Sequence, residues 1–309
     1  MFIFELEKTN LDLSKTEAEF LLNINLKCLK DNFFITSQKF NLNQIKRLAY
    51  TKNIFKYLDE NINFSKIKLN LIKNTYKLEI KSFTKKTLDK KELVNYIYNN
   101  LEKPKVDVKN PNHIYYIFYF KSKFYLFEKI YENIDEPSKR RAHLRQFNHP
   151  TSLNPKQAKA MINLSKAKKE ILDCFCGMGG ILLEASLMNL NVKASDISEY
   201  MINKAKINLK DFKKIKFQVQ DATKLKIKSE AIVTDLPFGK NSFVSENLNE
   251  LFTKFFVNAQ NLTSSLVVGH SSNLNIKKLI KNTSWKILKE FSIYVHKSMT
   301  RKITILIKN

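Results

Sequence analysis

The sequence predicts an α/β protein in two parts, a C-terminal half with a parallel sheet covered by helices and a mixed α+β N-terminal half. Beyond residue 155, short apolar strands alternate regularly with helices, as in sheets that are buried on both faces. All five glycines lie in the second half, and three of the five arginines fall between Pro137 and Pro150, in a segment without a clear period. That segment is typical of a linker. The expected parts are 1–60, 61–131, the linker 132–154, and 155–309.

The N-terminal half contains segments with the hydrophobic period of a helix and segments with that of a strand. A helix is expected to begin at the N-cap Ser14, with Glu17 completing a capping box, and another is opened by Asp89. Strand-like residues fill the segments between and after the helices. The expected elements are a strand at 2–7, helices at 14–25 and 43–58, a strand at 68–83, a helix at 89–101, and strands within 105–130 around the turn Asn110–Asn112.

The C-terminal half alternates between the two kinds of element, which favours a parallel sheet. In such sheets ligands bind at the carboxyl ends of the strands. The expected strands are 170–175, 192–197, 215–222, 230–236 and 264–270, the expected helices are 180–189, 199–212, 247–262 and 275–282, and a hairpin over 285–308 closes the chain.

The composition indicates an anionic partner. Fifty-four Lys and Arg against 29 Asp and Glu give a net charge of +25, while 43% hydrophobic residues supply a core. Nucleic acid is the partner that such a charge favours, although a general drift toward lysine would give the same total. Acidic residues occur within seven positions of the start, and no apolar run approaches the roughly 18 residues of a membrane span. We expect a soluble, cytoplasmic protein with no membrane partner.

Three cysteines, Cys28, Cys174 and Cys176, suit neither a disulfide framework nor a zinc site, so no structural metal is expected. The sequence does not determine the oligomeric state, and a monomer is favoured.

A glycine turn follows the first strand of the C-terminal half, in the segment DCFCGMGG. Gly177 and Gly179 allow a tight turn with its amide groups aimed at a ligand. A dinucleotide fingerprint would need glycine where Leu182 stands, which argues against a nicotinamide cofactor. Asp196 and Asp221 end the next two strands, where carboxylates can accept from a ribose and an adenine amino group. Each acid alone is more often a cap or a loop residue; together they favour an adenosine-containing cofactor without phosphates.

The fourth strand ends in DLPFG, residues 235–239. The Asp235 carboxylate and a carbonyl held rigid by Pro237 can accept hydrogen bonds from a planar exocyclic amine, and Phe238 offers a ring face to a flipped base. An isolated PFG would be an ordinary turn with a buried Phe. Its position beside the cofactor turn favours the functional interpretation.

These four elements together resemble the class I amino-methyltransferases that act on nucleic-acid bases. The flanking segments RRAHLRQFNHPTSLNPKQAKAMINL and YVHKSMTRKITIL are more specifically similar to the archaeal tRNA guanosine-10 N2-methyltransferases, and VKNPNHIYYIFYFKSKFYLF is similar to the end of a THUMP domain. The resemblance spans nearly the whole chain. It implies a Rossmann-like methyltransferase domain at 155–309, a ferredoxin-like region at 1–60 and a THUMP RNA-binding domain at 61–131.

The resemblance also implies a cofactor, S-adenosylmethionine, a substrate, tRNA, and roles for individual residues. Asp235 and the Leu236 carbonyl are expected to orient the target 2-amino group, with Pro237 and Phe238 shaping the pocket. Leu236 and Phe238 stand where proline and tyrosine are commoner, which leaves guanosine 6 open as the target. The expected cofactor residues are Asp173, Phe175, Gly177 and Gly179 at the methionine part, Asp196 and Ile197 at the ribose, and Asp221 and Ala222 at the adenine.

Arg140, Arg141, Arg145 and Lys240 are the expected contacts with tRNA phosphates, although the arginines could equally be solvated linker residues. Uridine carbon-5 methyltransferases have a similar glycine turn but need a nucleophilic cysteine, and Cys174 and Cys176 are expected to be ordinary buried thiols. Two alternatives stay open. One is a non-catalytic tRNA-binding protein with a vestigial methyltransferase fold, and the other is an amino-methyltransferase for DNA or protein, against which the THUMP-like half weighs.

Overall fold

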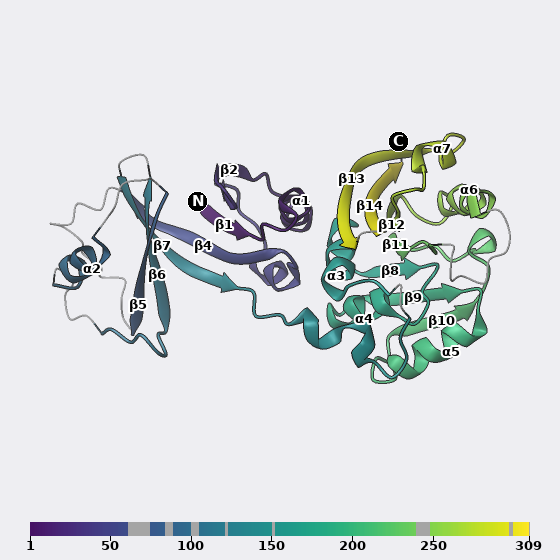
Figure 1. The fold of residues 1–309 in the computed structure, drawn as a ribbon, viewed down its shortest axis with the longest axis horizontal. Helices are drawn as coiled ribbons and strands as arrows, with labels where there is room; N and C mark the ends of the chain where they lie inside the picture. Colours follow the sequence, from purple (N-terminus) through teal and green to yellow (C-terminus); the bar gives the residue numbers. More distant parts are fainter. Residues whose placement is uncertain are drawn as a thin grey trace. The chain divides into compact units, whose positions relative to one another are not determined.

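A computed structural model of the chain describes residues 1–60, 75–83, 89–99, 105–120, 123–149, 152–238, 248–296 and 299–308. The chain forms two compact units, each assembled from three segments (Figure 1). Unit 1 comprises residues 1–11, 24–41 and 51–134, and unit 2 comprises residues 12–23, 42–50 and 135–309. No helix in the described ranges is both long and apolar enough to cross a bilayer.

Unit 1 is built on a seven-stranded sheet in the order β2-β3-β1-β4-β7-β6-β5. All neighbours are antiparallel except β5 and β6. Aromatic side chains dominate one core cluster, where Phe118 contacts Phe55 and Phe127 edge to face. The elements are β1 Phe2–Leu6, β2 Lys27–Lys30, β3 Phe33–Thr36, β4 Thr51–Glu60, β5 Tyr76–Ser82, α2 Lys90–Asn99, β6 His113–Phe120 and β7 Lys123–Glu132.

Two local expectations for the N-terminal half are wrong. The helix expected at 43–58 is a short 3-10 helix, η1 (Leu42–Arg47), followed by the long strand β4, which pairs with β1 and β7. Aromatic and β-branched residues that suit a pleated strand outweigh the apparent helical period there. Asp89 does cap α2, because its Oδ1 accepts from the backbone N–H of Glu92 at 3.0 Å.

The first helix, α1, spans Leu11–Leu22, so Ser14 and Glu17 lie inside it and do not form a capping box. Glu17 is completely buried and its carboxylate accepts from the backbone N–H groups of Ala49 and Tyr50 and from Asn163 Nδ2, at 2.7, 2.9 and 2.6 Å. Burial raises the pKa of this carboxyl group above its ordinary value, and the three donors oppose that rise. Glu17 therefore joins α1 and the segment after η1 to the body of unit 2.

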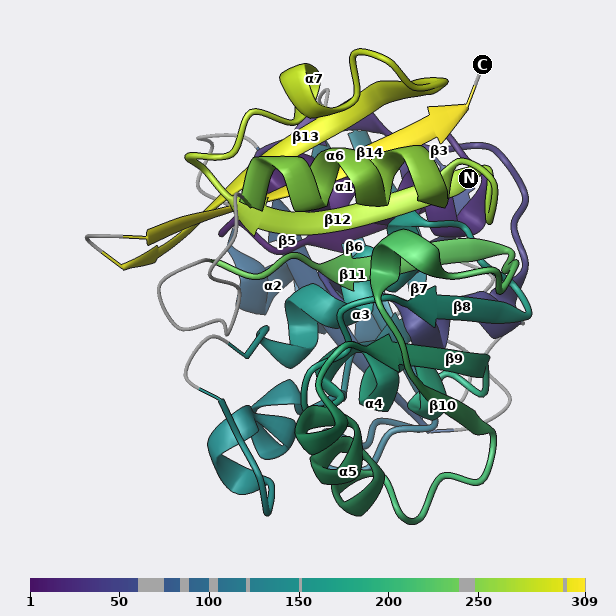
Figure 2. The ribbon, with the colours of Figure 1, turned by 90° about the vertical axis from the view of Figure 1, so that its right-hand side faces the viewer.

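Unit 2 contains the expected alternating fold. Its sheet has the order β10-β9-β8-β11-β12-β14-β13, parallel except at β14, which is antiparallel to both of its neighbours. Figure 2 shows these strands with α6 in front of β12. The strands are β8 Glu170–Asp173, β9 Asn191–Asp196, β10 Ile215–Val219, β11 Ala231–Asp235, β12 Ser265–Ser271, β13 Trp285–His296 and β14 Met299–Lys308.

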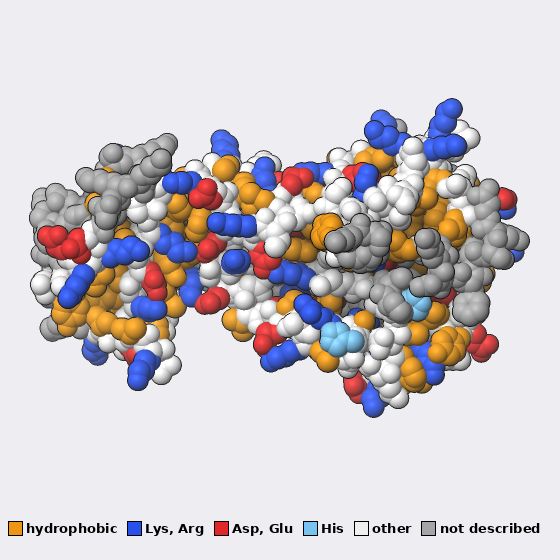
Figure 3. Space-filling model, viewed as in Figure 1, with side chains coloured by type: hydrophobic (Ala, Val, Ile, Leu, Met, Phe, Trp, Pro, Cys, Tyr) orange, Lys and Arg blue, Asp and Glu red, His pale blue; other side chains and the backbone are white. Residues whose placement is uncertain are grey.

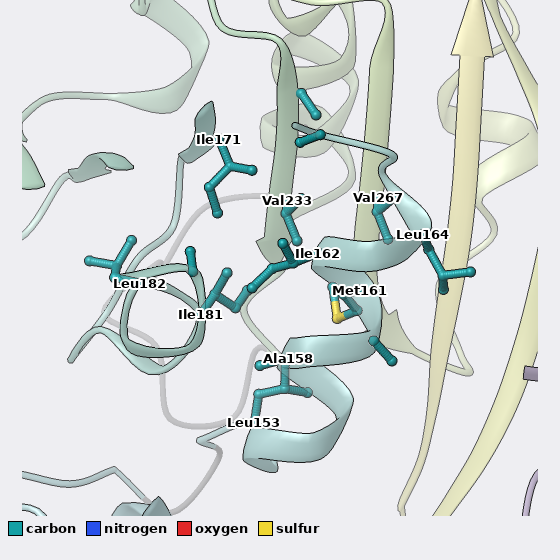
Figure 4. Packing of buried hydrophobic residues seen from close by; sticks show 14 of the residues in the cluster. Leu153, Ala158, Met161, Ile162, Leu164, Ile171, Ile181, Leu182, Val233 and Val267 are labelled. Atoms are coloured by element: carbon teal, nitrogen blue, oxygen red, sulfur yellow. The ribbon is translucent and has the colours of Figure 1, made fainter. Parts of the chain in front are cut away.

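Helices cover both faces of this sheet. One core cluster joins strand residues to side chains from α1, α3, α4 and α5, and the other joins alternate strand residues to side chains from α6 and α7. In Figure 4, Met161 and Ile162 of α3 lie against Val233 and Val267 of β11 and β12. The helices are α3 Pro155–Leu164, α4 Gly180–Leu187, α5 Glu199–Asn208, α6 Leu248–Ala259 and α7 Ile276–Leu279. Both faces being buried, the carboxyl ends of the central strands are where polar side chains can gather.

Candidate active site

The carboxyl ends of β8, β9 and β11 bring three aspartates together. Asp173 ends β8, Asp196 ends β9 and Asp235 ends β11, and β8 pairs with both other strands. The negative charges of Asp196 and Asp235 both raise the pKa of Asp173, which shows that the three carboxylates share one electrostatic environment. The sequence predicted this gathering from the strand ends alone.

A tight turn follows β8 and leads into α4. Gly177 and Gly179 have φ values of +48° and +88°, a region that residues with a Cβ rarely adopt, and Gly179 is the N-cap of α4. At Gly179 a Cβ would also lie 2.7 Å from Leu209 Cδ1. The amide of Gly177 donates to Asp196 Oδ2 at 2.9 Å, which fixes the turn against β9. The turn thus presents the N-terminal end of α4 beside the acidic strand ends.

Asp173 is linked directly to the strand that carries Asp235. Its Oδ1 accepts from the Thr234 hydroxyl at 2.6 Å and from the Phe175 N–H at 3.2 Å. Burial raises the pKa of Asp173 to about 7, and these two hydrogen bonds oppose that rise. Asp173 therefore titrates near neutral pH, and the donors of both these hydrogen bonds are uncharged.

Asp196 and Asp221 each organise the loop after their strand. The two oxygens of Asp196 accept from the amides of Gly177 and Ser198, at 2.9 and 3.0 Å. Burial raises the pKa of Asp196, and its backbone hydrogen bonds lower it again. Asp221 is the N-cap of the 3-10 helix η5 (Ala222–Lys224), where its Oδ1 accepts from the amide and hydroxyl of Thr223. Capping and ligand binding are compatible, because a carboxylate oxygen accepts more than one hydrogen bond.

Asp235 differs from the other two acids in its partner, because it contacts an arginine and does so through one oxygen. Oδ1 is buried and has no hydrogen-bond partner in the part of the chain that the structure describes. Oδ2 contacts Nη2 of Arg301 at 3.1 Å. Burial raises the pKa of Asp235 to about 6, and the Arg301 charge opposes that rise. A buried, unpaired acceptor is costly, and such groups concentrate at functional sites.

Three adjacent strands build this part of the site. Gly269 of β12 pairs in register with Asp235 of β11, and a Cβ at Gly269 would lie 2.2 Å from Asp235 Oδ1. Arg301 lies on β14, paired with Ser271 two residues beyond Gly269. The missing side chain at Gly269 leaves the space in which the carboxylate lies.

Phe238 lies against the other side of the arginine. The Arg301 guanidinium carbon is 4.9 Å from the centre of the Phe238 ring, a cation–π distance. Arg301 is only 3% exposed, so its charge acts with little screening by water. One buried cation therefore contacts both the acid and the aromatic of the segment DLPF.

The other expected site residues contribute mainly backbone or packing. The Phe175 ring packs edge to face on Phe255 of α6, so its side chain belongs to the core. Leu236 is buried, and its amide donates to the Gly269 carbonyl at 2.8 Å. Ala222 is buried near α6, whereas Ile197 is 68% exposed beside Asp196 and leaves an apolar side chain free to cover a ligand.

Arg140 is a member of a closed ion-pair network. Its guanidinium donates to both oxygens of Asp135 and to both oxygens of the nearly buried Glu184, at 2.7 to 3.0 Å, and Lys159 donates to Asp135 at 2.7 Å. These cations lower the pKa of Asp135 to about 2, and the two carboxylates raise the pKa of Arg140. The structure thus gives Arg140 a role inside unit 2, and its expected phosphate contact stays a prediction.

The remaining expected RNA contacts have different surroundings. Arg141 is exposed, whereas Arg145 is half-buried, with its guanidinium near Gly180 at the start of α4. Lys240 lies outside the described residues, as does Gly239. On the face in Figure 3, Lys and Arg side chains are scattered among Asp and Glu in each unit and do not form a single patch.

Cys174 and Cys176 are buried, and burial raises the pKa of both thiols well above the ordinary value. A thiol in this state is a poor nucleophile. The expectation that neither cysteine performs covalent catalysis fits these surroundings.

Sequence reasoning missed two residues of the site and left a third unassigned. Thr234 joins Asp173 to the Asp235 strand, and Gly269 leaves room for the Asp235 carboxylate. For Arg301, as for His149 and His296, the sequence left a place beside the active site and a capping or core role equally open. Gly269 had a signal, since a glycine within an apolar strand indicates close approach of another group. The partner of Arg301 had no signal, because the pairing depends on the strand order.

A glycine turn beside acidic strand ends, on a sheet whose last strand is antiparallel, defines this unit as a methyltransferase domain. Residues 142–302 match the family described as "RMKL-like, methyltransferase domain", and the chain belongs to that family. A second model, described as "DNA methylase", matches residues 15–207.

Three curated relatives bear on the substrate. The tRNA (guanine(10)-N2)-dimethyltransferase of Pyrococcus abyssi is 36% identical over 55% of this chain and 54% of its own length. That of Methanothermobacter thermautotrophicus is 37% identical over 54% and 52%. The tRNA (guanine(6)-N2)-methyltransferase of Methanocaldococcus jannaschii is 26% identical over 51% and 54%. The chain spans about half the length of these relatives in the matched regions.

Solved structures support the fold over the whole chain. TrmN from Thermus thermophilus has a TM-score of 0.50 and 16% identity, covering 100% of this chain and 99% of that one. The SAH-bound structure of SMU.472 has a TM-score of 0.50 and 12% identity, covering 100% and 98%. The predicted Rossmann-like half and β-containing N-terminal half are therefore both confirmed as a fold.

S-adenosylmethionine is the cofactor of this methyltransferase family, as expected, and the residues present fit it. Gly177 and Gly179, which suit the positive φ values of the turn, leave it free of side chains at these two positions, and Asp173 and Asp196 can place negative charge where a cationic cofactor would lie. No phosphate-binding lysine stands in the turn, which suits a cofactor without phosphates.

Proposed function

We propose that this protein transfers a methyl group from S-adenosylmethionine to the 2-amino group of a guanosine in tRNA, at guanosine 10, giving N2-methylguanosine or its dimethyl form. The single observation that carries the proposal is the open Oδ1 of Asp235, a buried acceptor at the end of β11 next to the cofactor turn. The likeness to two guanine(10)-N2 enzymes supports the choice of base and position.

The chain's own residues perform most of the work by positioning. The lone pair of the guanine 2-amino group is delocalised into the ring, so the amine is a poor nucleophile until its protons are held by acceptors. Asp235 Oδ1 and the Leu236 carbonyl would accept those protons, while the Phe238 ring holds the base plane. S-adenosylmethionine, when bound, supplies an electrophilic methyl group. Alignment of the amine with that group is then the main requirement.

The cofactor roles follow the strand ends. In the proposal Asp173, with Gly177 and Gly179, holds the methionine part, Asp196 with Ile197 the ribose, and Asp221 with Ala222 the adenine. Phe175 contributes its backbone, since its ring is in the core. Because Asp173 titrates near pH 7, its charge and hence its attraction for a cationic cofactor depend on pH in the neutral range.

We assign tRNA recognition to the N-terminal half, with a ferredoxin-like region at 1–60 and a THUMP domain at 61–131. Arg141, Arg145 and Lys240 are proposed phosphate contacts. Arg140 contributes indirectly, because its ion pairs fix the backbone of the segment that carries Arg141 and Arg145. The high positive charge of the chain supports a nucleic-acid substrate. A cytoplasmic location follows from a tRNA substrate.

Guanosine 6 is a second candidate position. The relative that acts on guanine 6 matches half of this chain, and Leu236 and Phe238 depart from the commoner residues of the motif. The chemistry would be unchanged, because the same 2-amino group would enter the same site.

The test is methyl transfer to unmodified tRNA transcripts from labelled S-adenosylmethionine, with nucleosides identified by mass. We expect N2-methylguanosine that disappears when guanosine 10 is replaced and that is lost in Asp235→Ala while tRNA binding persists. Label that moves with guanosine 6 would transfer the proposal to that position. Tight tRNA binding without any label would overturn it and favour a non-catalytic binding module.

A further inference from the structure

We propose that Arg301 is the positioning residue that selects guanine, by holding Asp235 as a carboxylate that can only accept hydrogen bonds and by fixing Phe238 beside it. The inference rests on the proposed function and names the residue that determines base specificity in that site. It is carried by two contacts, from Arg301 Nη2 to Asp235 Oδ2 at 3.1 Å and from the guanidinium carbon to the Phe238 ring centre at 4.9 Å.

The contacts divide the Asp235 carboxylate between two tasks. Arg301 contacts Oδ2, and Oδ1 is left as the open acceptor among the described residues. An ionised carboxylate offers no proton, whereas a protonated carboxyl group is a donor as well as an acceptor. The Arg301 charge therefore decides which hydrogen-bonding pattern the site presents to a base.

The two patterns suit different bases. In guanine the 2-amino group lies next to N1–H, which is also a donor. This edge of the base therefore presents two adjacent donors. A base with an amino group next to an unprotonated ring nitrogen presents a donor and an acceptor. An acceptor-only Asp235 fits the first edge and repels the ring nitrogen of the second, because two acceptors would face each other.

The surroundings leave Arg301 as the main influence on this choice. Among the residues that the structure describes, the charged groups that act on Asp235 are Arg301 from β14 and Asp173 from β8. Gly269 of β12 lies against the carboxylate without a side chain, and Met161 of α3 lies near Gly269. Burial favours the protonated carboxyl group, and the pKa of Asp235 stays at about 6 with Arg301 lowering it. Without the cation, the protonated form would persist to higher pH.

The guanidinium is also suited to hold two partners at once. It is planar, so it can direct one N–H to a carboxylate while its face lies on an aromatic ring. Lysine would keep the charge but not the stacked geometry. Comparing arginine with lysine at position 301 therefore distinguishes the effect of the positive charge from the effect of the planar shape.

The test compares two tRNA transcripts in the full-length protein, one with guanosine and one with 2-aminopurine at the target position. 2-Aminopurine keeps the 2-amino group but has an unprotonated N1. We expect wild-type protein at pH 8 to use guanosine with a much larger kcat/KM. In Arg301→Gln the ratio of 2-aminopurine to guanosine kcat/KM should rise by about tenfold or more, whereas Arg301→Lys should keep the ratio close to that of wild type.

A second measurement needs no variant. In wild-type protein the same ratio should rise as the pH falls through about 6, the pKa of Asp235, because the carboxyl group then gains a proton to donate. Arg301→Gln should show the rise at higher pH. The affinity for S-adenosylmethionine and the melting temperature of each variant are measured as controls, because they identify any variant that fails to fold.

The outcomes separate this inference from the proposed function. Methylation of guanosine by wild-type protein tests the function alone. If guanosine is methylated but the base ratio is the same in Arg301→Gln and Arg301→Lys and does not change with pH, Arg301 is only structural and the inference is overturned.

Discussion

Two arginines of unit 2 contact buried carboxylates, and they do so in opposite ways. Arg140 directs its donors to four oxygens of Asp135 and Glu184, and Lys159 adds a further cation. Arg301 contacts one oxygen of Asp235 and leaves the other open among the described residues. The first cluster is saturated and the second is not.

The difference separates a structural use of buried charge from a chemical one. A saturated network holds the segment before α3 to α4, and each of its four carboxylate oxygens already accepts from Arg140. An unsaturated carboxylate is unfavourable in the free protein, and it gains a partner only when a donor such as an amine arrives. The open oxygen at the end of β11 therefore makes Asp235, and not Asp135 or Glu184, the acid with an acceptor available to a ligand among the described residues.

The largest expected effect is at the unsaturated acid. Asp235→Asn keeps the size of the side chain, but its single neutral oxygen cannot accept from both Arg301 and the amine. With the oxygen at Arg301, an NH2 group faces the amine. Turnover should fall by about 10²- to 10⁴-fold, while S-adenosylmethionine still binds. Asp196→Asn is the matched control, in which cofactor affinity should be the first property to fall. Single-turnover assays and calorimetry measure the two, and equal turnover in Asp235→Asn and wild type would remove Asp235 from the chemistry.

At the saturated cluster the expected effect is on stability. Arg140→Ala leaves Glu184, whose side chain is 2% exposed, without its cation, and breaking such a pair costs about 3–5 kcal/mol of unfolding free energy. Arg141→Ala is the control, because Arg141 is exposed. Denaturant unfolding should show a loss for the first variant only. Similar loss for both would mean that the network stabilises nothing.

Gly269 tests the space that the unsaturated acid needs. In Gly269→Ala the new methyl group would meet Asp235 Oδ1 at 2.2 Å, so the carboxylate or β12 must move, at a cost of about 1–3 kcal/mol in unfolding free energy together with lower turnover. Gly180→Ala should be tolerated in the melting experiment, since its nearest neighbours are 3.6 Å away or more. Normal stability and turnover in Gly269→Ala would show that the space beside the Asp235 carboxylate is large enough for a methyl group.

Asp173 differs from the acids of both clusters, because its hydrogen-bond donors are uncharged groups and not an arginine. Its folded-state pKa of about 7 lies above the ordinary value, so the native protein holds a proton that the unfolded chain releases above about pH 4. Its contribution to the unfolding free energy of the free protein therefore falls between about pH 4 and 7, and affinity for a cationic cofactor rises over the upper part of that range. Asp173→Asn should flatten both curves. A wild-type affinity that does not vary with pH would contradict this.

The smallest expected effect concerns tRNA phosphates. Arg141→Ala removes one exposed charge, so the slope of log K for tRNA against log salt should fall by up to about one, with stability unchanged. Arg140→Ala, in protein that remains folded, should leave the slope nearly as in wild type. A larger slope change for Arg140 than for Arg141 would reverse the assignment made from their contacts.

Strand ends and turns were predictable from the sequence because each depends on local pattern. The apolar strands of unit 2 alternate with helices, and this pattern alone places the acids at residues 173, 196 and 235 on one edge of the sheet. The glycine turn was predictable for the same reason, since only glycine suits the backbone of residues 177 and 179.

What could not be predicted depends on long-range pairing. Arg301 meets Asp235 only because β14 inserts between β12 and β13, and nothing local to residue 301 indicates that order. Glu17 was interpreted as part of a helix cap, because its spacing from Ser14 fits a capping box, yet the N–H groups that donate to its carboxylate lie on residues far along the chain. The local sequence pattern predicts whether a segment is a helix or a strand, but only tertiary contacts determine which of its side chains find partners.

The placement of α1 and η1 in unit 2 has a consequence for how this chain can be made and divided. Residues 12–23 and 42–50 leave the ribosome long before α3, whose Asn163 holds Glu17. Leu13, Ala49 and Tyr50 stay uncovered by their core until the last segment is synthesised. The methyltransferase domain is therefore not separable at residue 135. A gene fragment beginning there would encode the whole second sheet but lack part of its covering layer.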